Sequence, residues 1–507
     1  MGGHRRSPED EVARSSSSVS VGADAARTMV GSSLADRDLG AENGTAMRAE
    51  NGTAMRDPRC ESKTSVVAID MGYGHLRAAE PLAEVFKTGV AHADLPPIGG
   101  SADHQLWLRV RQFHEHASKL SQLPFVGSPM RRVLDGVTSI PPLYPYRDLS
   151  SPTIGVELLA RFVQRGLGEG LIEHLKASGD ALVTTFYAPA IVADHGRCER
   201  VYCVVTDTDI NRIWVARNPG ASRIRYFVPS LRAARRLRSY GVPADRIEYT
   251  GFPLPTDLVG GTALMALRRN LAARLVRLDP RGTFRDQARH DLDHFLGPLP
   301  TTDEHKPPLL TFAVGGAGAQ TQIARHFLRG FRRPVSAGAV RIALVAGVRA
   351  AVAEQFCEWV RDAGLGSELG NGIQVLIESD WTSYYRAFNR LLAETDMLWT
   401  KPSEMVFYAA LGIPEILSWP VGVHERYNRR WVLESGAGFK QGNPRFAAQW
   451  IHDWLQDGTL AGAAWSGFLR LPKFGTHRIH DVVCGAPGDA RRPGILESQP
   501  WSGGAKR

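Results

Sequence analysis

Short apolar and β-branched runs alternate with helical patterns along most of the chain. In the first half, the runs lie at 65–70 (SVVAID), 181–186 (ALVTTF), 201–206 (VYCVVT) and 224–228 (IRYFV). A second series lies at 309–314, 342–347, 373–378, 396–400 and 415–419. Strands that alternate with helices in this way form parallel sheets covered on both faces. The two series therefore predict two α/β domains.

Changes in composition divide the chain further. Residues 1–62 are rich in Ser, Gly and charge and repeat the octapeptide AENGTAMR, which is typical of a disordered tail; a misassigned start codon is the alternative. An N-terminal domain is expected over 63–255 and a C-terminal domain with closing helices over 308–484. Between them, 256–307 predicts an interdomain connection, and 485–507 predicts a flexible end.

Composition excludes several classes of protein. The 507 residues are 43% hydrophobic and 22% charged, as in globular proteins, and no run of about 18 apolar residues could span a bilayer. We therefore expect a soluble or peripheral protein. The net charge is +9, and residues 1–57 hold seven arginines against nine acidic residues, so the positive balance belongs to the remainder. An anionic partner such as a nucleotide, a nucleic acid or an acidic lipid surface is favoured.

Cysteine usage and the N-terminus favour the cytoplasm. The cysteines at 60, 198, 203, 357 and 484 form no CxxC pair and no even-numbered framework, so neither a zinc site nor a disulfide scaffold is expected. The N-terminus lacks the apolar core of a secretory signal, and Arg6 stands where myristoylation requires Ser or Thr.

Two glycine-rich loops follow predicted strands, at 70–75 (DMGYGH) and 315–320 (GGAGAQ). Open α/β sheets bind ligands beyond the carboxyl ends of their strands. The second loop precedes a helical segment, and the free N–H groups of a helix N-terminus suit a phosphate. Neither loop matches the Walker pattern GxxxxGKS/T, so an ATPase of that type is not expected. Either loop could also serve packing alone.

The C-terminal half carries TKPSEMVFYAALGIP at 400–414, HERYN at 424–428 and WVLESGAGF at 431–439. This order resembles GT-B glycosyltransferases, in which a strand, a KPGG turn, a helix and a GLP strand precede a Gln-Glu-x-x-Asn turn and a VENGAG-like helix. In the N-terminal half, GYGHLRAAEPLA at 72–83 resembles the GGGHRAAA loop of the lipid-glycosylating branch, which includes monogalactosyldiacylglycerol synthase and the peptidoglycan N-acetylglucosaminyltransferase. The resemblance covers about 65–480 and implies two Rossmann-like parallel-sheet domains that face a cleft.

The resemblance also implies a function and a site. A nucleotide sugar, expected to be UDP-linked, is the co-substrate with no other cofactor, and its sugar passes with inversion to a lipid or other hydrophobic hydroxyl. His75 matches the candidate general base, a task suited to a histidine titrating near neutrality. Asp207 could orient His75, act as the base, or only cap a helix. The donor-binding candidates are Gly316, Gly318, Ala319, Gln320, Lys401, Ser403, Glu404, His424, Glu425 and Asn428. The acceptor-side candidates are Gly72, Gly74, Trp107 and Trp214.

Three departures from the family pattern weaken the donor assignment. Phe407 stands where many relatives have the Glu that holds the ribose. Glu404 could replace it or merely cap a helix. The turn KPSE replaces KPGG, and His424 replaces the commoner Gln. These differences leave the donor identity open and keep a degenerate nucleotide-sugar-binding protein without catalysis as an alternative. A GT-B nucleotide-sugar epimerase, which would act on the donor alone, is the enzymatic alternative.

No metal is expected, because GT-B enzymes offset diphosphate charge with helix dipoles and side chains. Asp207-Thr208-Asp209 spells a DxD motif but lies in the N-terminal domain. Segment 106–120 is a basic amphipathic stretch that could lie on an anionic membrane at the inner face, or pack on the core.

The arginines at 232, 235, 236 and 238 follow a predicted helix cap at Ser230 and are expected on the exposed face of that helix. Because no aromatic residues interleave with these arginines and no recognition motif accompanies them, nucleic acid is not expected as a partner. The oligomeric state is not predicted.

Overall fold

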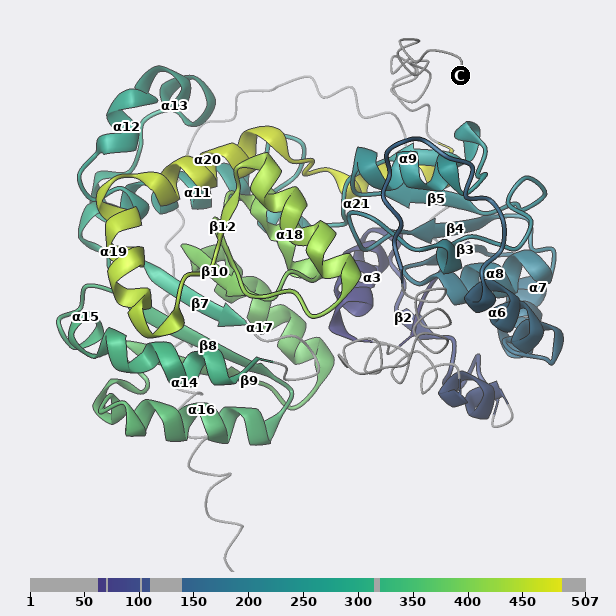
Figure 1. The fold of residues 1–507 in the computed structure, drawn as a ribbon, viewed down its shortest axis with the longest axis horizontal. Helices are drawn as coiled ribbons and strands as arrows, with labels where there is room; N and C mark the ends of the chain where they lie inside the picture. Colours follow the sequence, from purple (N-terminus) through teal and green to yellow (C-terminus); the bar gives the residue numbers. More distant parts are fainter. Residues whose placement is uncertain (1–62, 70–71, 101–102, 110–138, 314–319, 486–507) are drawn as a thin grey trace, which may run out of the picture.

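The computed structural model describes residues 63–69, 72–100, 103–109, 139–313 and 320–485 (Figure 1). Its N-terminal sheet has six parallel strands in the order β2-β1-β3-β4-β5-β6. The strands are β1 (Thr64–Ala68), β2 (Val90–His92), β3 (Ala181–Thr184), β4 (Val201–Val204), β5 (Arg225–Val228) and β6 (Ile247–Tyr249). The helices of this half include α3 (Tyr73–Phe86), α6 (Ile154–Gln164), α7 (Glu169–Ser178), α8 (Tyr187–His195), η1 (Arg212–Trp214), α9 (Leu231–Ser239) and η2 (Ala244–Arg246), and residues 103–109 are also helical.

The C-terminal sheet is also parallel, in the order β12-β11-β10-β7-β8-β9. Its strands are β7 (Leu309–Ala313), β8 (Arg341–Gly347), β9 (Ile373–Ile377), β10 (Met397–Thr400), β11 (Glu415–Leu417) and β12 (Gly438–Lys440). Helices α14 (Gln322–Leu328), α15 (Arg332–Ser336), α16 (Ala350–Asp362), α17 (Trp381–Glu394), α18 (Val423–Ser435), α19 (Ala447–Gln456) and α20 (Thr459–Arg470) surround it, with short turns η4 (Arg329–Phe331), η5 (Gly366–Glu368), η6 (Glu404–Leu411) and η7 (Pro444–Phe446). Two Rossmann-like domains confirm the predicted GT-B α/β architecture.

Burial explains why the strands read as continuous apolar runs. Every residue of β1, β3, β4, β7 and β10 is buried, because helices cover both faces of each sheet. The strand order reverses at β1, which lies between β2 and β3, and at β7, which lies between β8 and β10. Crevices at such reversals are where open α/β sheets bind ligands. The loops that leave β1, β3, β7 and β10 are therefore the places to examine.

The segment between the two sheets packs on the C-terminal domain. It holds α10 (Thr256–Val259), α11 (Met265–Leu278), α12 (Thr283–Gln287), α13 (Arg289–Leu296) and η3 (Thr301–His305). Leu267, Leu271 and Leu275 of α11 belong to the C-terminal hydrophobic core. The predicted connection at 256–307 is thus a set of helices built onto the second domain.

The last described helix, α21 (Gly475–Val483), returns to the first domain. Ile479 and Val483 share a hydrophobic cluster with Leu76 and Phe86 of α3 and with β1. Thr476 Oγ1 also donates a hydrogen bond of 2.6 Å to the carbonyl of Leu254. In Figure 1, α21 lies beside the N-terminal domain although it follows the C-terminal one in sequence. The chain therefore crosses between the domains twice.

The structure also bears on the expected absence of a disulfide scaffold and on the expected absence of a membrane-spanning helix. Cys198, Cys203 and Cys357 are free, whereas Cys484, just beyond α21, is disulfide-bonded, a bond that the cysteine spacing did not predict. Among the described residues, no helix combines the length and apolarity needed to cross a membrane.

Arg274 of α11 ties the connection to the second domain. Its side chain is 1% exposed and donates to the carbonyls of Thr395 (2.7 Å), Leu411 (3.0 Å) and Gly412 (3.2 Å). Burial disfavours the charge and lowers the pKa of Arg274 to about 10, still well above neutral pH. One cation therefore satisfies carbonyls at the ends of α17 and η6 that would otherwise be buried without partners.

We expect Arg274→Leu to lower the free energy of unfolding by about 3 kcal/mol, because it leaves several buried carbonyls unsatisfied. Urea unfolding followed by circular dichroism measures this change. Arg269→Leu removes an exposed arginine from the same helix and serves as the control, with little effect expected. Equal stability of the two variants would contradict the role given to Arg274.

Candidate active site

His75 stands in the first turn of α3, at the strand-order reversal of the N-terminal sheet. Its Nδ1 lies 2.8 Å from the carbonyl oxygen of Thr185, which follows β3. A carbonyl can only accept, so Nδ1 carries the hydrogen and Nε2 holds the free lone pair of the neutral ring. Thr185 Oγ1 in turn donates 2.9 Å to the His75 carbonyl, which fixes both residues. Phe186 and Trp214 pack against the ring, with centroids 4.8 and 6.4 Å away.

The surroundings of His75 keep the imidazole neutral. Burial is the largest influence and lowers its pKa below the usual value, although the Thr185 carbonyl and the charges of Asp207 and Glu404 oppose the shift. At neutral pH the ring is therefore uncharged, with Nε2 able to accept a proton. Among the described residues, no hydrogen bond to Nε2 is present.

Two glycines shape the loop before His75. Gly72 precedes α3 with φ 126°, a conformation that L side chains rarely adopt. At Gly74, a Cβ atom would lie 2.9 Å from Glu404 Oε2, which belongs to the C-terminal domain. The absence of a side chain at Gly74 therefore lets the two domains approach closely at this point.

Asn428 of α18 joins the two domains through its side-chain amide. Its Oδ1 accepts from the backbone N–H and from Oγ1 of Thr208, both at 2.9 Å. Its Nδ2 donates to Asp207 Oδ1 at 2.9 Å and to the Pro402 carbonyl at 3.2 Å. All four hydrogen-bonding positions of this fully buried amide are thus occupied. Asp207 contacts Asn428 rather than capping a helix, and it acts on His75 through its charge.

A second interdomain contact pairs Glu404 with Arg77. Arg77 Nη1 lies 2.5 Å from Glu404 Oε1, and the two side chains are 1% and 11% exposed. Arg77 also hydrogen-bonds the hydroxyl of Tyr384 on α17. Burial is the largest single influence and would raise the pKa of Glu404, but the charges of Arg77 and Lys401 together with hydrogen bonds to the carboxylate outweigh it, so the pKa is lowered. Glu404 is therefore ionised and committed to Arg77.

Lys401, in the loop after β10, pairs with Glu425 of α18 at 2.7 Å. Burial is the largest single influence and disfavours the lysine charge, yet Glu425 together with the charges of Glu404 and Asp207 outweighs it and raises the pKa of Lys401. The other carboxylate oxygen, Oε2, accepts from the backbone N–H of Val421 at 2.6 Å and helps to cap α18. Neighbouring His424 is exposed and lies within electrostatic range of His75 and Glu425. Ser403 is buried and stands at the N-cap position, just before η6.

Gln320 connects the region after β7 with the end of β11. Its Nε2 donates 2.7 Å to the carbonyl of Trp419, and its Oε1 accepts from Ser418 Oγ. With φ 70°, Gln320 adopts a left-handed conformation uncommon for residues other than glycine. Gly316, Gly318 and Ala319 lie outside the described residues, so the candidate phosphate loop is represented here by Gln320 alone.

The remaining candidates fall in the cores. Trp214 is buried but touches His75, whereas Trp107 is 3% exposed and belongs to the N-terminal core. Phe407, at the position where relatives have the ribose-binding Glu, is 2% exposed and stacks on Phe252 with centroids 4.4 Å apart. Phe407 thus fills the place where the chain first crosses between domains.

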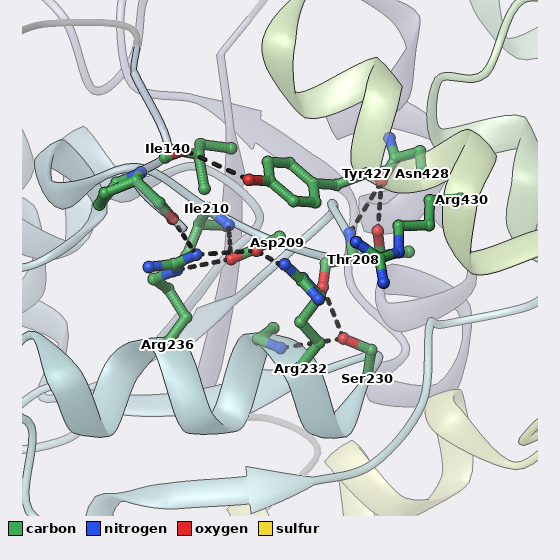
Figure 2. A network of polar contacts seen from close by, with 12 residues as sticks. Ile140, Thr208, Asp209, Ile210, Ser230, Arg232, Arg236, Tyr427, Asn428 and Arg430 are labelled. Atoms are coloured by element: carbon green, nitrogen blue, oxygen red, sulfur yellow. Dashed lines mark hydrogen bonds and ion pairs between the residues drawn. The ribbon is translucent and has the colours of Figure 1, made fainter. Parts of the chain in front are cut away.

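The segment Asp207–Asp209 does not form a metal site. Asp209 is fully buried, and its carboxylate accepts hydrogen bonds from Arg232 Nε at 2.7 Å and from Arg236 Nε at 2.8 Å. Figure 2 shows both ion pairs. Arg236 is also fully buried, so reading it as exposed was wrong; Arg235 and Arg238 are exposed as expected. The predicted cap at Ser230 is confirmed, because its Oγ accepts from Ala233 N. Within the described ranges, no group of His, Cys, Asp or Glu suits a metal ion.

Most of the described candidates therefore meet at one junction. His75 lies within electrostatic range of Asp207, Glu404 and His424. Lys401 lies within range of Glu425, Glu404 and Asp207. Sequence reasoning missed Arg77, Thr185 and Ser418, because each acts through a partner far away in the sequence. No local motif marks these three residues.

Comparisons with known proteins give limited matches. A model of a domain of unknown function (DUF6938) matches residues 353–443, and no curated protein matches. Solved structures similar to the chain include MurG of Acinetobacter baumannii (13% identity, TM-score 0.44, 83% of this chain and 99% of that one). A putative UDP-N-acetylglucosamine 2-epimerase of Listeria monocytogenes is similar at 13% identity and a TM-score of 0.45, over 85% of this chain and 98% of that one. The glycosyltransferase SnogD of Streptomyces nogalater is similar at 14% identity and a TM-score of 0.40, over 83% of this chain and 99% of that one. At these values the likenesses carry no argument about the reaction.

A double-mutant cycle tests the contact between Arg77 and Glu404. Arg77→Met leaves a buried carboxylate without its partner and is expected to cost about 3–5 kcal/mol of unfolding free energy. In that background Glu404→Gln should restore part of the loss, because it removes the unpaired charge. Urea unfolding of the four proteins measures the coupling, with the exposed Arg390→Met of α17 as control. Simple additivity would show that the pair does not interact.

Proposed function

We propose that the protein is a glycosyltransferase that transfers a sugar from a UDP-sugar to a hydroxyl of a lipid or other hydrophobic acceptor. The observation that carries this proposal is that two groups, one from each domain, share Asp207 and Glu404 as charged neighbours. One is His75, whose Nε2 is free to accept a proton. The other is the Lys401–Glu425 pair, beside the loops that the resemblance assigns to the donor.

In the proposed reaction, His75 Nε2 accepts the proton of the acceptor hydroxyl as the oxygen attacks the anomeric carbon. The bond from that carbon to the diphosphate breaks, and the nucleoside diphosphate leaves with the bonding electrons. A single displacement of this kind inverts the anomeric centre. The imidazolium that forms is stabilised by the Thr185 carbonyl and by the negative charges of Asp207 and Glu404.

The leaving diphosphate needs positive charge. Lys401 is held at the junction by Glu425, and its ammonium has further donor positions for phosphate oxygens. Gly316, Gly318 and Ala319 remain in the proposal as backbone donors, with Gln320 and Ser403 beside them and His424 near the sugar. We further propose that the reaction takes place in the cytoplasm, at the inner face of the membrane, and that it needs no metal ion.

A second candidate is a nucleotide-sugar-binding protein that does not catalyse transfer. The specific observation is that two of the expected donor ligands are already engaged. Glu404 pairs with Arg77, and the Asn428 amide has every position filled by Asp207, Thr208 and Pro402. If these contacts persist with the donor bound, the sugar has fewer ligands than in a typical glycosyltransferase.

His75→Gln is expected to reduce the transfer rate by about 10²- to 10⁴-fold, because it removes the proton acceptor. Donor binding measured by calorimetry should be unchanged. In the unsubstituted protein, the lowered pKa of His75 predicts a rate that is level near neutral pH and falls only below the ordinary histidine value of about 6.5. An undiminished rate in the variant would remove His75 from the mechanism.

Calorimetry with UDP, GDP and their sugars tests the donor site. We expect UDP to bind and Lys401→Ala to weaken that binding by about tenfold, through loss of one ion pair with the diphosphate. The exposed Lys440→Ala, at the end of β12, is the control. Conversion of the donor alone would identify an epimerase, and binding without turnover would favour the second candidate. If no nucleotide binds, the donor assignment fails.

A further inference from the structure

A strap, residues 140–150, runs over the place where the two domains meet. The carbonyl of Ile140 accepts from Tyr427 Oη of α18 at 3.3 Å, and that of Pro141 accepts from Arg236 Nη2 at 2.6 Å (Figure 2). At the other end, Leu149 N donates 2.8 Å to the Ser239 carbonyl. One anchor therefore belongs to the C-terminal domain, and the others belong to the N-terminal domain.

The middle of the strap exposes two tyrosines. Tyr144 and Tyr146 are 58% and 54% exposed, and their ring centroids lie 5.0 Å apart. Between the anchors, Leu143 is buried and holds the segment down. The paired rings are thus displayed from a segment that is tied at both ends.

Arginines from both domains flank these rings. Arg235 of α9 lies within electrostatic range of Tyr146, and Arg430 of α18 within range of Tyr144. Arg426, exposed one helical turn before Arg430, continues this side of α18. Next to it, Arg429 lies over the ring of Trp419, at 5.3 Å.

We call this surface the junction face and define it by Tyr144, Tyr146, Arg235, Arg426, Arg429, Arg430 and Trp419. Trp419 is 65% exposed, so three large aromatic side chains and four arginines share the face. Glu434 pairs with Arg430 at 2.5 Å and offsets part of the charge. The remaining arginines leave the face positive.

This composition fits the surface of an anionic bilayer. Tyrosine and tryptophan prefer the headgroup region, where the ring meets apolar matter and the polar atom meets water. Arginines beside them attract acidic headgroups. The earlier membrane candidate at 106–120 is different, because Trp107 is buried in the core and Leu106 packs against it; its remainder from 110 lies outside the described residues.

We propose that the junction face docks on a bilayer that contains anionic lipid, and that docking and nucleotide binding strengthen each other. The face is complete only when α18 lies against the strap and α9. The same arrangement lets Asn428 hydrogen-bond to Asp207 and Thr208, and it places Asp207 and Glu404 within electrostatic range of both Lys401 and His75. A bilayer that binds the complete face favours this arrangement, and a donor that needs it does the same. The coupling rests on the proposed function; the docking does not.

Cosedimentation with vesicles tests docking. The protein should bind vesicles that contain phosphatidylglycerol, and binding should weaken as salt rises. Vesicles of phosphatidylcholine alone should bind it poorly. The double variant Tyr144→Ser, Tyr146→Ser and the single variant Arg235→Glu should each lose about tenfold or more in affinity. Arg361→Glu, an exposed reversal on α16, is the matched control and should lose much less. Circular dichroism and urea unfolding confirm that the variants fold.

The docking proposal is overturned if the protein does not bind anionic vesicles, or if the strap variants bind these vesicles with the same affinity as the control variant. Capture of a soluble polyanion such as heparin, without vesicle binding, would overturn it as well.

Calorimetry of UDP with and without phosphatidylglycerol vesicles tests the coupling. We expect affinity to rise by about fivefold or more with vesicles, within the usual range of coupling between two sites. The double strap variant should bind UDP normally in solution and show no rise. Equal UDP affinity under both conditions overturns the coupling. If UDP never binds but vesicles do, the proposed function fails while the docking face stands.

Discussion

The arrangement of the molecule depends on buried polar groups that only the opposite domain can satisfy. Asn428 fills all four positions of its amide with Asp207, Thr208 and Pro402, and Arg77 reaches across to Glu404. Leaving such groups without partners inside a protein costs far more than an average hydrogen bond contributes. Apolar surfaces tolerate sliding, whereas these contacts fix one relative position. That fixed position gives His75 of one domain and Lys401 of the other the same charged neighbours, Asp207 and Glu404.

The same contacts explain why His75 differs from an ordinary helical histidine. Its Nδ1 is committed to a backbone carbonyl, which chooses the tautomer, while burial keeps the ring uncharged. The negative charges of Asp207 and Glu404, one from each domain, lie within electrostatic range of the ring and would stabilise the imidazolium, although neither carboxylate hydrogen-bonds to the neutral ring. Acid–base chemistry at this position therefore depends on the packing of both halves, although the histidine belongs to one.

The sequence predicts the architecture well, because continuous apolar runs between helical patterns report strands that are buried on both faces. Ser230 was identified correctly as a helix cap for a similar local reason. The failures are long-range. Arg236 looked exposed because its partner Asp209 lies on a preceding loop, and nothing local links Arg77 to Glu404, 327 residues away. Phe407 signalled a missing ribose ligand, but its stacking on Phe252 follows from the chain crossing there. Pairing across domains is decided by three-dimensional packing, which no window of sequence contains.

The return of α21 to the first domain has a consequence for synthesis on the ribosome. Helix α3, which carries His75, completes its hydrophobic contacts only with Ile479 and Val483. Nascent chains generally fold domain by domain as they emerge. Here the first Rossmann-like unit must wait, with one flank uncovered, until nearly the whole second unit has been translated. Vectorial folding would therefore leave the half that carries the histidine unfinished for longest, and a chain cut short before α21 would lack that cover however well its second unit folded.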